Sequence, residues 1–169
     1  MKKMNRIVAI SSLIAFAGNA SARLIIEDFL DDIGGAAFDA ELDYSFQGGS
    51  WELFPGELNL WPETVDISVN SLMAGEYIES VEVQWTDFCG IGCTSIEVFG
   101  ATSTATQFNA TVSASETWTL STGDIGEEIL GFSLSSFEGR FERITINVVP
   151  APASILVLMG GLVAVRRRR

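Results

Sequence analysis

The chain contains two cysteines, and their spacing predicts a covalent bond. Cys89 and Cys93 are separated by three residues, two of which are glycines that let the backbone turn tightly. In an oxidising compartment such a pair forms a disulfide that closes a small loop. A structural zinc site would need further cysteine or histidine ligands, and the sequence has none. The spacing also departs from the redox motif Cys-x-x-Cys, so we expect a structural disulfide.

Acidic residues provide a second candidate site. Asp124, Glu127 and Glu128 lie within one short stretch ahead of a predicted strand, and carboxylate oxygens are calcium ligands. They form a candidate calcium site, the one cofactor that the sequence suggests. The alternative is a solvated acidic loop that keeps the protein soluble. Two carboxylates could also act as a glycosidase pair, but the chain has little room for a substrate cleft, so we predict no enzyme.

Two tryptophans form a third candidate site. Trp51 and Trp61 lie in a segment with Pro55 and Gly56, which predicts a loop or an edge strand. Exposed tryptophans on a β-sandwich can stack against sugar rings, so both are candidate carbohydrate-binding residues. The alternative is that they fill the core or cover its open end.

Missing residue types exclude several kinds of chemistry. The chain has no histidine, and no lysine or arginine lies between Arg23 and Arg140. Imidazole relays, histidine metal ligands and Schiff-base lysines are therefore absent from the middle of the chain. Seven of the ten basic residues lie near the two ends, which leaves three basic and 22 acidic residues, a net charge of −19, in the middle. Such a charge repels phosphate backbones, so we predict no nucleic-acid partner.

The middle segment, residues 23–149, alternates apolar and polar residues with a period of two, and glycines and prolines punctuate it at turn-like intervals. This pattern predicts eight to ten short strands and a short helix near Phe29–Ile33. Apolar alternation marks the strands around Phe38–Phe46, Val65–Val69, Val81–Trp85, Ile96–Val98, Trp118–Leu120, Phe132–Leu134 and Ile144–Val149. The expected fold is all-β, a two-layer antiparallel β-sandwich of jelly-roll-like type.

Residues 1–22 have the three regions of a signal peptide. Basic residues come first, an apolar stretch of about 12 residues follows, and Ala20 and Ala22 provide the small-x-small pattern that signal peptidase recognises. The apolar stretch is shorter than the roughly 20 residues of a membrane span. The alternative is an ordinary N-terminal core helix. We expect export through signal peptidase, with cleavage after Ala22.

Residues 150–169 form a second terminal signal. Pro150 and Pro152 end the last predicted strand, and the 12 uncharged residues from Ser154 to Val165 lead to four arginines, Arg166, Arg167, Arg168 and Arg169. A helix over residues 151–165 would be about 22 Å long, shorter than the roughly 30 Å hydrocarbon core. We therefore expect a transient membrane anchor, with a permanently tail-anchored protein as the alternative.

This ending resembles the PEP-CTERM class of C-terminal sorting signals, in a Val-Pro-x-Pro-Ala form. The matching residues are Val149, Pro150, Ala151, Pro152 and Ala153, followed by an apolar segment and the arginines. The glutamate of the family motif is Ala151 here. The resemblance implies recognition by an exosortase, a membrane-embedded enzyme that removes the helix and basic tail. It also implies a β-sandwich middle domain and assigns no activity to it.

The sequence thus predicts an exported protein at the cell-envelope surface or outside the cell, with a non-catalytic structural or adhesive role. The expected partners are the export machinery, signal peptidase, an exosortase-like enzyme, the membrane transiently, and the exopolysaccharide layer. The alternative is a calcium-assisted carbohydrate-binding module. A glycan-active enzyme ranks third.

Overall fold

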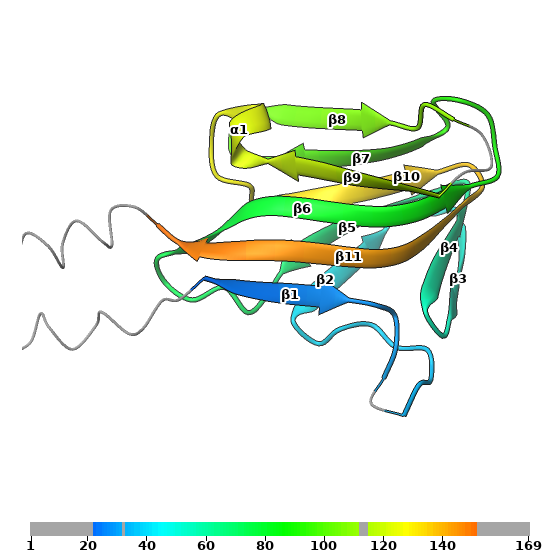
Figure 1. Ribbon diagram of the computed structural model, residues 1–169, viewed down its shortest axis with the longest axis horizontal. Helices are drawn as coiled ribbons and strands as arrows, with labels where there is room; N and C mark the ends of the chain where they lie inside the picture. Colours follow the sequence, from blue (N-terminus) through cyan, green and yellow to red (C-terminus); the bar gives the residue numbers. More distant parts are fainter. Residues whose placement is uncertain (1–21, 32, 112–114, 152–169) are drawn as a thin grey trace, which may run out of the picture.

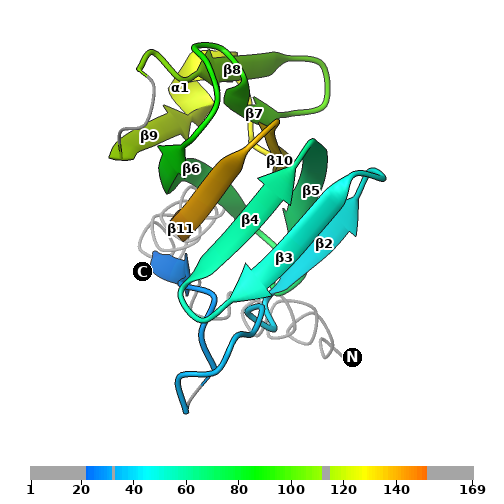
Figure 2. The ribbon, with the colours of Figure 1, turned by 90° about the vertical axis from the view of Figure 1, so that its right-hand side faces the viewer.

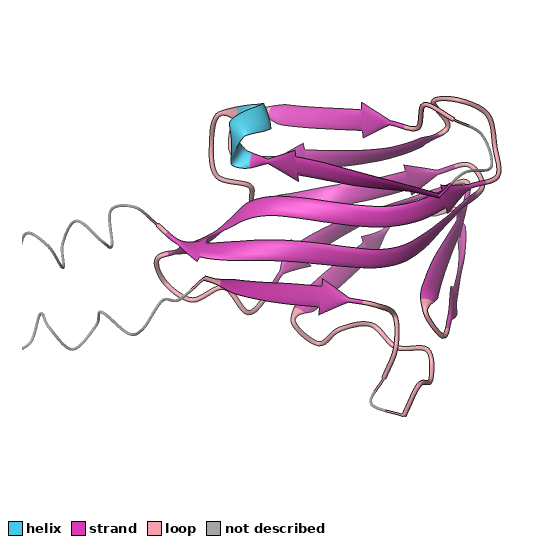
Figure 3. Cartoon of the chain, viewed as in Figure 1, coloured by secondary structure: helices cyan, strands magenta, loops and turns pink. Residues whose placement is uncertain are grey.

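The computed structural model describes residues 22–31, 33–111 and 115–151, which form strands and one short helix (Figure 3). The elements are β1 (Arg23–Glu27), β2 (Leu42–Phe46), β3 (Ser50–Phe54), β4 (Glu57–Trp61), β5 (Glu63–Val69), β6 (Glu76–Asp87), β7 (Thr94–Phe99), β8 (Thr104–Phe108), β9 (Ser115–Ser121), α1 (Thr122–Ile125), β10 (Gly131–Ser136) and β11 (Gly139–Pro150). No helix within these ranges is long and apolar enough to cross a membrane.

The strands form two antiparallel sheets that pack face to face (Figures 1 and 2). The first sheet has the order β3-β4-β11-β6-β9, and β1 pairs with β11 on the edge that β4 leaves free. The second sheet has the order β2-β5-β10-β7-β8. The prediction of an antiparallel β-sandwich is confirmed at this level.

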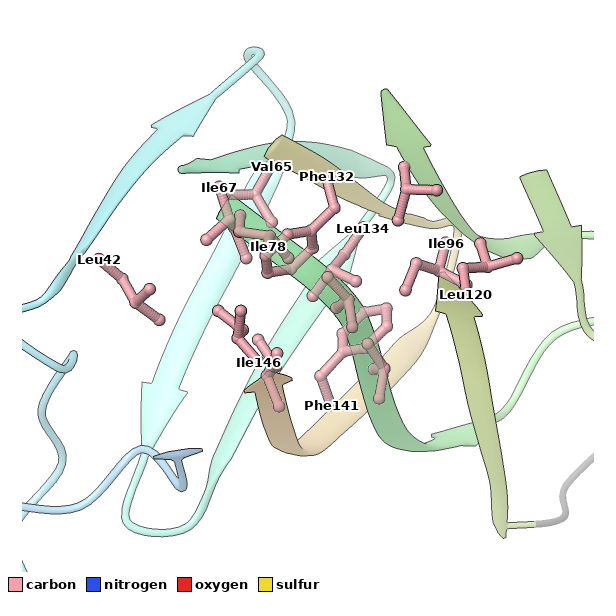
Figure 4. Packing of buried hydrophobic residues seen from close by; sticks show 14 of the residues in the cluster. Leu42, Val65, Ile67, Ile78, Ile96, Leu120, Phe132, Leu134, Phe141 and Ile146 are labelled. Atoms are coloured by element: carbon pink, nitrogen blue, oxygen red, sulfur yellow. The ribbon is translucent and has the colours of Figure 1, made fainter. Parts of the chain in front are cut away.

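The core lies between the two sheets. Alternate residues of each strand point inward, so the period-two pattern of the sequence becomes one apolar layer. Figure 4 shows this layer, in which Val65 and Ile67 of β5 meet side chains of β10 and of the facing sheet. The labelled members, all buried, are Leu42, Val65, Ile67, Ile78, Ile96, Leu120, Phe132, Leu134, Phe141 and Ile146.

The helix predicted near Phe29–Ile33 is wrong. This segment forms a turn, because the Asp31 carboxylate accepts hydrogen bonds from the backbone N–H groups of Ile33 (3.0 Å) and Gly35 (2.6 Å). Such local side-chain acceptors compete with helical backbone hydrogen bonds. Phe29 also has a left-handed backbone, with φ of 59°.

The two ends of the domain lie side by side. Arg23 at the start of β1 pairs with Val148 near the end of β11. Val149 and Pro150 belong to β11, and Ala22 and Ala151 flank the paired strands. Most of the signal peptide and of the sorting signal, including Ala20, Pro152, Ala153 and the terminal arginines, lies outside the described residues, so those predictions stay predictions.

Candidate functional site

An open pocket lies at the end of the sandwich away from the paired termini. Its volume is about 440 Å³. Its walls come from the β2–β3 turn, the β4–β5 junction, the disulfide loop and the end of β10. The lining residues are Gln47, Gly48, Gly49, Pro62, Glu63, Thr64, Cys93, Ser135, Ser136 and Phe137. The lining is therefore rich in hydroxyl and amide groups, with one aromatic ring.

Glu63 builds one wall of the pocket. Its buried carboxylate accepts hydrogen bonds from the backbone N–H groups of Gln47 (2.9 Å), Gly48 (3.1 Å), Gly49 (2.8 Å) and Thr64 (2.8 Å). These bonds hold the β2–β3 turn against β5. A Cβ atom on Gly49 would lie 1.8 Å from the Pro62 carbonyl oxygen, so only glycine permits this approach. The carboxylate is thus a structural clamp with its oxygens already engaged.

The disulfide loop contributes Cys93 to the pocket lining. Cys89 and Cys93 are bonded, which confirms the predicted disulfide. The Cys93 carbonyl accepts a hydrogen bond from the Phe137 N–H (3.1 Å), and the Asn109 amide donates to the Gly90 carbonyl (3.1 Å). The loop is therefore fixed to both neighbouring segments, and it positions Phe137 at the mouth of the pocket.

Phe137 is the exposed aromatic residue of the pocket, with 62% of its surface accessible to solvent. Thr64 and Ser135, on the outer face of the second sheet, lie beside it and share a hydrogen bond of 2.9 Å between their hydroxyl oxygens. Gln47 donates from its amide to the Asp66 carboxylate on the same face. An apolar ring next to hydroxyl, amide and carboxylate groups suits a ligand that has both apolar faces and many hydroxyl groups.

The structure does not bring Trp51 and Trp61 together. They lie on β3 and β4, where Trp51 pairs with Leu60 and Ser50 pairs with Trp61, so the two tryptophans point to opposite faces of the hairpin. Trp51 stacks on Phe46 of the other sheet at 4.3 Å and contacts Phe38, and it remains 42% exposed. Trp61 is partly buried on the outer face of the first sheet. β3, which carries Trp51, is an edge strand as expected, whereas β4, which carries Trp61, lies inside the sheet between β3 and β11.

The three predicted calcium ligands have separate surroundings. The backbone N–H and the hydroxyl of Ser121 donate to Asp124, and these bonds hold the pKa of its carboxyl below the usual value. Hydrogen bonds from the backbone N–H groups of Thr102 and then Ser103 lower the pKa of Glu127. Glu128 is exposed. Among residues 22–31, 33–111 and 115–151, no three His, Cys, Asp or Glu side chains are grouped to hold a metal.

The pocket residues Gln47, Thr64, Ser135 and Phe137 were not predicted from the sequence. One available signal is the alternation along β10, where Phe132 and Leu134 point inward and Phe137 falls on the outward parity. A phenylalanine on the solvent side of a strand end is a candidate binding residue. The convergence of the two turns and the disulfide loop required the three-dimensional structure.

The fold is similar to that of a family 29 carbohydrate-binding module from Piromyces equi, with a TM-score of 0.51 and 10% identity over 79% of this chain and 94% of that chain. Another family 29 carbohydrate-binding module has a TM-score of 0.49 and 12% identity over 75% and 88% of the two chains. A low-affinity xylan-binding module, CBM86, from Roseburia intestinalis has a TM-score of 0.47 and 15% identity over 75% and 95%. At these identities the likeness concerns the fold alone. No protein-family model matches the sequence, and no curated protein matches it.

Proposed function

We propose that the folded domain is a non-catalytic carbohydrate-binding module and that its pocket is the binding site. The observation that carries the proposal is the exposed Phe137 ring beside the Thr64–Ser135 hydroxyl pair. A sugar ring can stack its C–H face on an aromatic ring while its hydroxyl groups exchange hydrogen bonds with neighbouring polar groups. The similarity of the fold to a carbohydrate-binding module supports the proposal at the level of the scaffold.

The pocket lining fits a protein that binds its ligand without catalysing a reaction on it. Among the described lining residues, Glu63 carries a carboxylate. Its two oxygens accept hydrogen bonds from four backbone N–H groups. Glycosidases generally need two carboxyl groups about 5 to 10 Å apart, one of them free to transfer a proton. The lining therefore supplies recognition groups and no acid–base pair.

The test is binding of the purified full chain to an array of neutral and acidic glycans, with Phe137→Ala as the variant. We expect the wild type to bind at least one glycan and Phe137→Ala to lose at least tenfold in affinity. Phe54→Ala is the matched control, because Phe54 is also an exposed phenylalanine but lies on β3 in the first sheet. Trp51→Ala and Trp61→Ala test the two tryptophans separately. A folded wild-type protein that binds no glycan contradicts the proposal, and so does an equal loss in Phe54→Ala.

The cellular setting remains our proposal from the sequence: export, processing by an exosortase-like enzyme, and an adhesive or structural role at the cell surface or in the exopolysaccharide layer. Residues 1–22 and 150–169 flank the domain of residues 23–149 in this proposal. The paired ends of β1 and β11 support it, because both proposed processing sites would then lie at one end of the domain. Mass spectrometry of protein recovered outside the cell should find neither Met1 nor the terminal arginines, and finding either one intact contradicts the proposal.

Two finer predictions also remain proposals. Jelly-roll-like is the proposed subclass of the sandwich. Calcium is the proposed cofactor of Asp124, Glu127 and Glu128, although two of these carboxylates already accept hydrogen bonds. If calcium binds there, adding it raises the melting temperature of the wild type. The melting temperature of the double variant Glu127→Gln/Glu128→Gln should then stay the same with and without calcium. Equal melting curves in calcium and in chelator contradict the calcium proposal.

A further inference from the structure

The pocket continues into a row of side chains across the outer face of the second sheet. Antiparallel pairing aligns Thr64 with Ser135, Ser135 with Ser95, and Ser95 with Phe108. Paired residues of neighbouring strands point to the same face, so these four side chains form one row across β5, β10, β7 and β8. We call them the outer row. Its three hydroxyl residues have short side chains, so nothing in this row projects far from the sheet between the pocket and Phe108.

The outer row ends in a second exposed aromatic residue. Phe108 is 57% exposed, close to the 62% of Phe137. Phe137 lies two residues after Ser135, just past the end of β10, and Phe108 lies on β8, two strands away from Ser135. Strand spacings of about 4.8 Å and a rise of about 3.3 Å per residue place the two backbones roughly 12 Å apart. One sugar ring cannot stack on both phenylalanines at this separation.

A second row beside the outer row carries negative charge. Asp66 pairs with Ser133, and Ser133 pairs with Glu97, whose carboxylate accepts a hydrogen bond from Thr106 (2.9 Å). The three arginines among the described residues lie on β1 and β11, in the other sheet. A carboxylate-bearing glycan would meet repulsion on this face, whereas an uncharged glycan would find hydrogen-bond acceptors.

From this arrangement we infer that the site takes an uncharged polysaccharide chain that lies across β5, β10, β7 and β8, with Phe137 and Phe108 as two separate stacking positions. This inference rests on the proposed carbohydrate binding and adds the length and the charge class of the ligand. A chain long enough to reach Phe108 gains a contact that a short sugar cannot make. Affinity therefore depends on chain length, and Phe108 carries that dependence.

The experiment is calorimetry of the full chain with the hexasaccharides and disaccharides of β-1,4-glucan, β-1,4-mannan and β-1,4-xylan, and with a galacturonic-acid hexasaccharide. We expect at least one neutral hexasaccharide to bind at least tenfold more tightly than its disaccharide, and the acidic hexasaccharide to bind at least tenfold more weakly than the neutral one. Phe108→Ala should remove the gain with length and leave disaccharide affinity unchanged. Phe137→Ala should weaken both lengths, and Phe54→Ala neither.

Each contrary outcome has a distinct meaning. Equal affinity for both lengths, or an unchanged length gain in Phe108→Ala, overturns the extended site while carbohydrate binding stands. Equal binding of the acidic hexasaccharide overturns the charge class alone. If a folded wild-type protein binds none of these sugars and nothing on the glycan array, the proposed function itself fails. Thermal unfolding of each variant shows whether a loss of binding reflects a loss of fold.

Discussion

Two groups of aromatic residues on this sandwich differ in their surroundings. The edge strands β3 and β2 of the two sheets lie side by side (Figure 2). Trp51 on β3 stacks on Phe46 of β2, and Phe38 and Tyr44 pack beside them, so these rings join the two edges; we call this the closed side. On the outer face, Phe137 and Phe108 stand among small polar side chains and are more exposed. Aromatic residues that meet partners from the facing sheet stabilise the fold, whereas those without such partners remain accessible to a ligand.

The largest expected loss of stability is that of Glu27→Ala, on the closed side of the sandwich. The buried Glu27 carboxylate accepts hydrogen bonds from the backbone N–H groups of Phe29 (2.6 Å) and Asp39 (2.8 Å) and from the Tyr44 hydroxyl. Removing it leaves these donors unsatisfied, which should lower the free energy of unfolding by about 3 kcal/mol. Urea denaturation measures the loss. A loss as small as that of an exposed glutamate such as Glu52 would show that the closed side contributes little.

The variants Phe46→Ala and Phe137→Ala together test whether the two groups of aromatic residues have different roles. Loss of the partly buried Phe46 ring should lower the free energy of unfolding by about 2.5 kcal/mol and leave glycan affinity unchanged in the folded protein. Phe137→Ala should change stability by less than about 0.5 kcal/mol, because its ring is mostly in solvent. Chemical denaturation and calorimetry on both variants separate the two effects. The opposite pattern would refute the distinction between the two aromatic groups.

Breaking the disulfide should affect the pocket more than the closed side. Cys89→Ser/Cys93→Ser removes a short cross-link, which should lower stability by about 2 kcal/mol in the chain-entropy model. It should also weaken glycan binding, because the Cys93 carbonyl holds the Phe137 backbone. Binding measured at a temperature where the variant is folded separates the two effects. Unchanged affinity would show that the loop does not position Phe137.

The smallest expected effect concerns Tyr44 and depends on pH. Burial, and then its hydrogen bond to Glu27, raises the pKa of the Tyr44 hydroxyl. The neutral hydroxyl therefore stabilises the fold fully below the unfolded-state pKa of about 10, and this contribution is lost as the pH rises above it. Tyr44→Phe should cost about 1.5 kcal/mol at neutral pH, and its difference from wild type should shrink above pH 10. A constant difference at all pH values would contradict this assignment.

The sequence predicted the sandwich because a period-two pattern has one good solution when every strand must bury one face. Val65 and Ile67 on β5 and Ile144 and Ile146 on β11 entered the core as predicted. The disulfide was also predictable, because the two cysteines are close in sequence.

The candidate site was harder to predict because its parts converge from distant segments. Glu63 gathers N–H groups from a turn 14 to 16 residues earlier, and Ser95 meets Phe108 only through strand pairing. Sequence patterning places both Trp51 and Phe137 near the end of a strand, and it does not show which of the two rings meets the facing sheet. What separates them is Phe46, which the second sheet brings into contact with Trp51.

The course of β11 has a mechanical consequence. This strand begins two residues after Phe137 and ends beside Arg23, so it runs the length of the domain from the pocket to the paired termini (Figure 1). Its neighbours are β6 on one side and β4 and β1 on the other. A pulling force between a ligand held at the pocket and a tether at the C-terminal end acts along this strand. Many ladder hydrogen bonds on both sides then share the load and must shear together, whereas pulling the two termini apart opens the β1–β11 ladder one bond at a time.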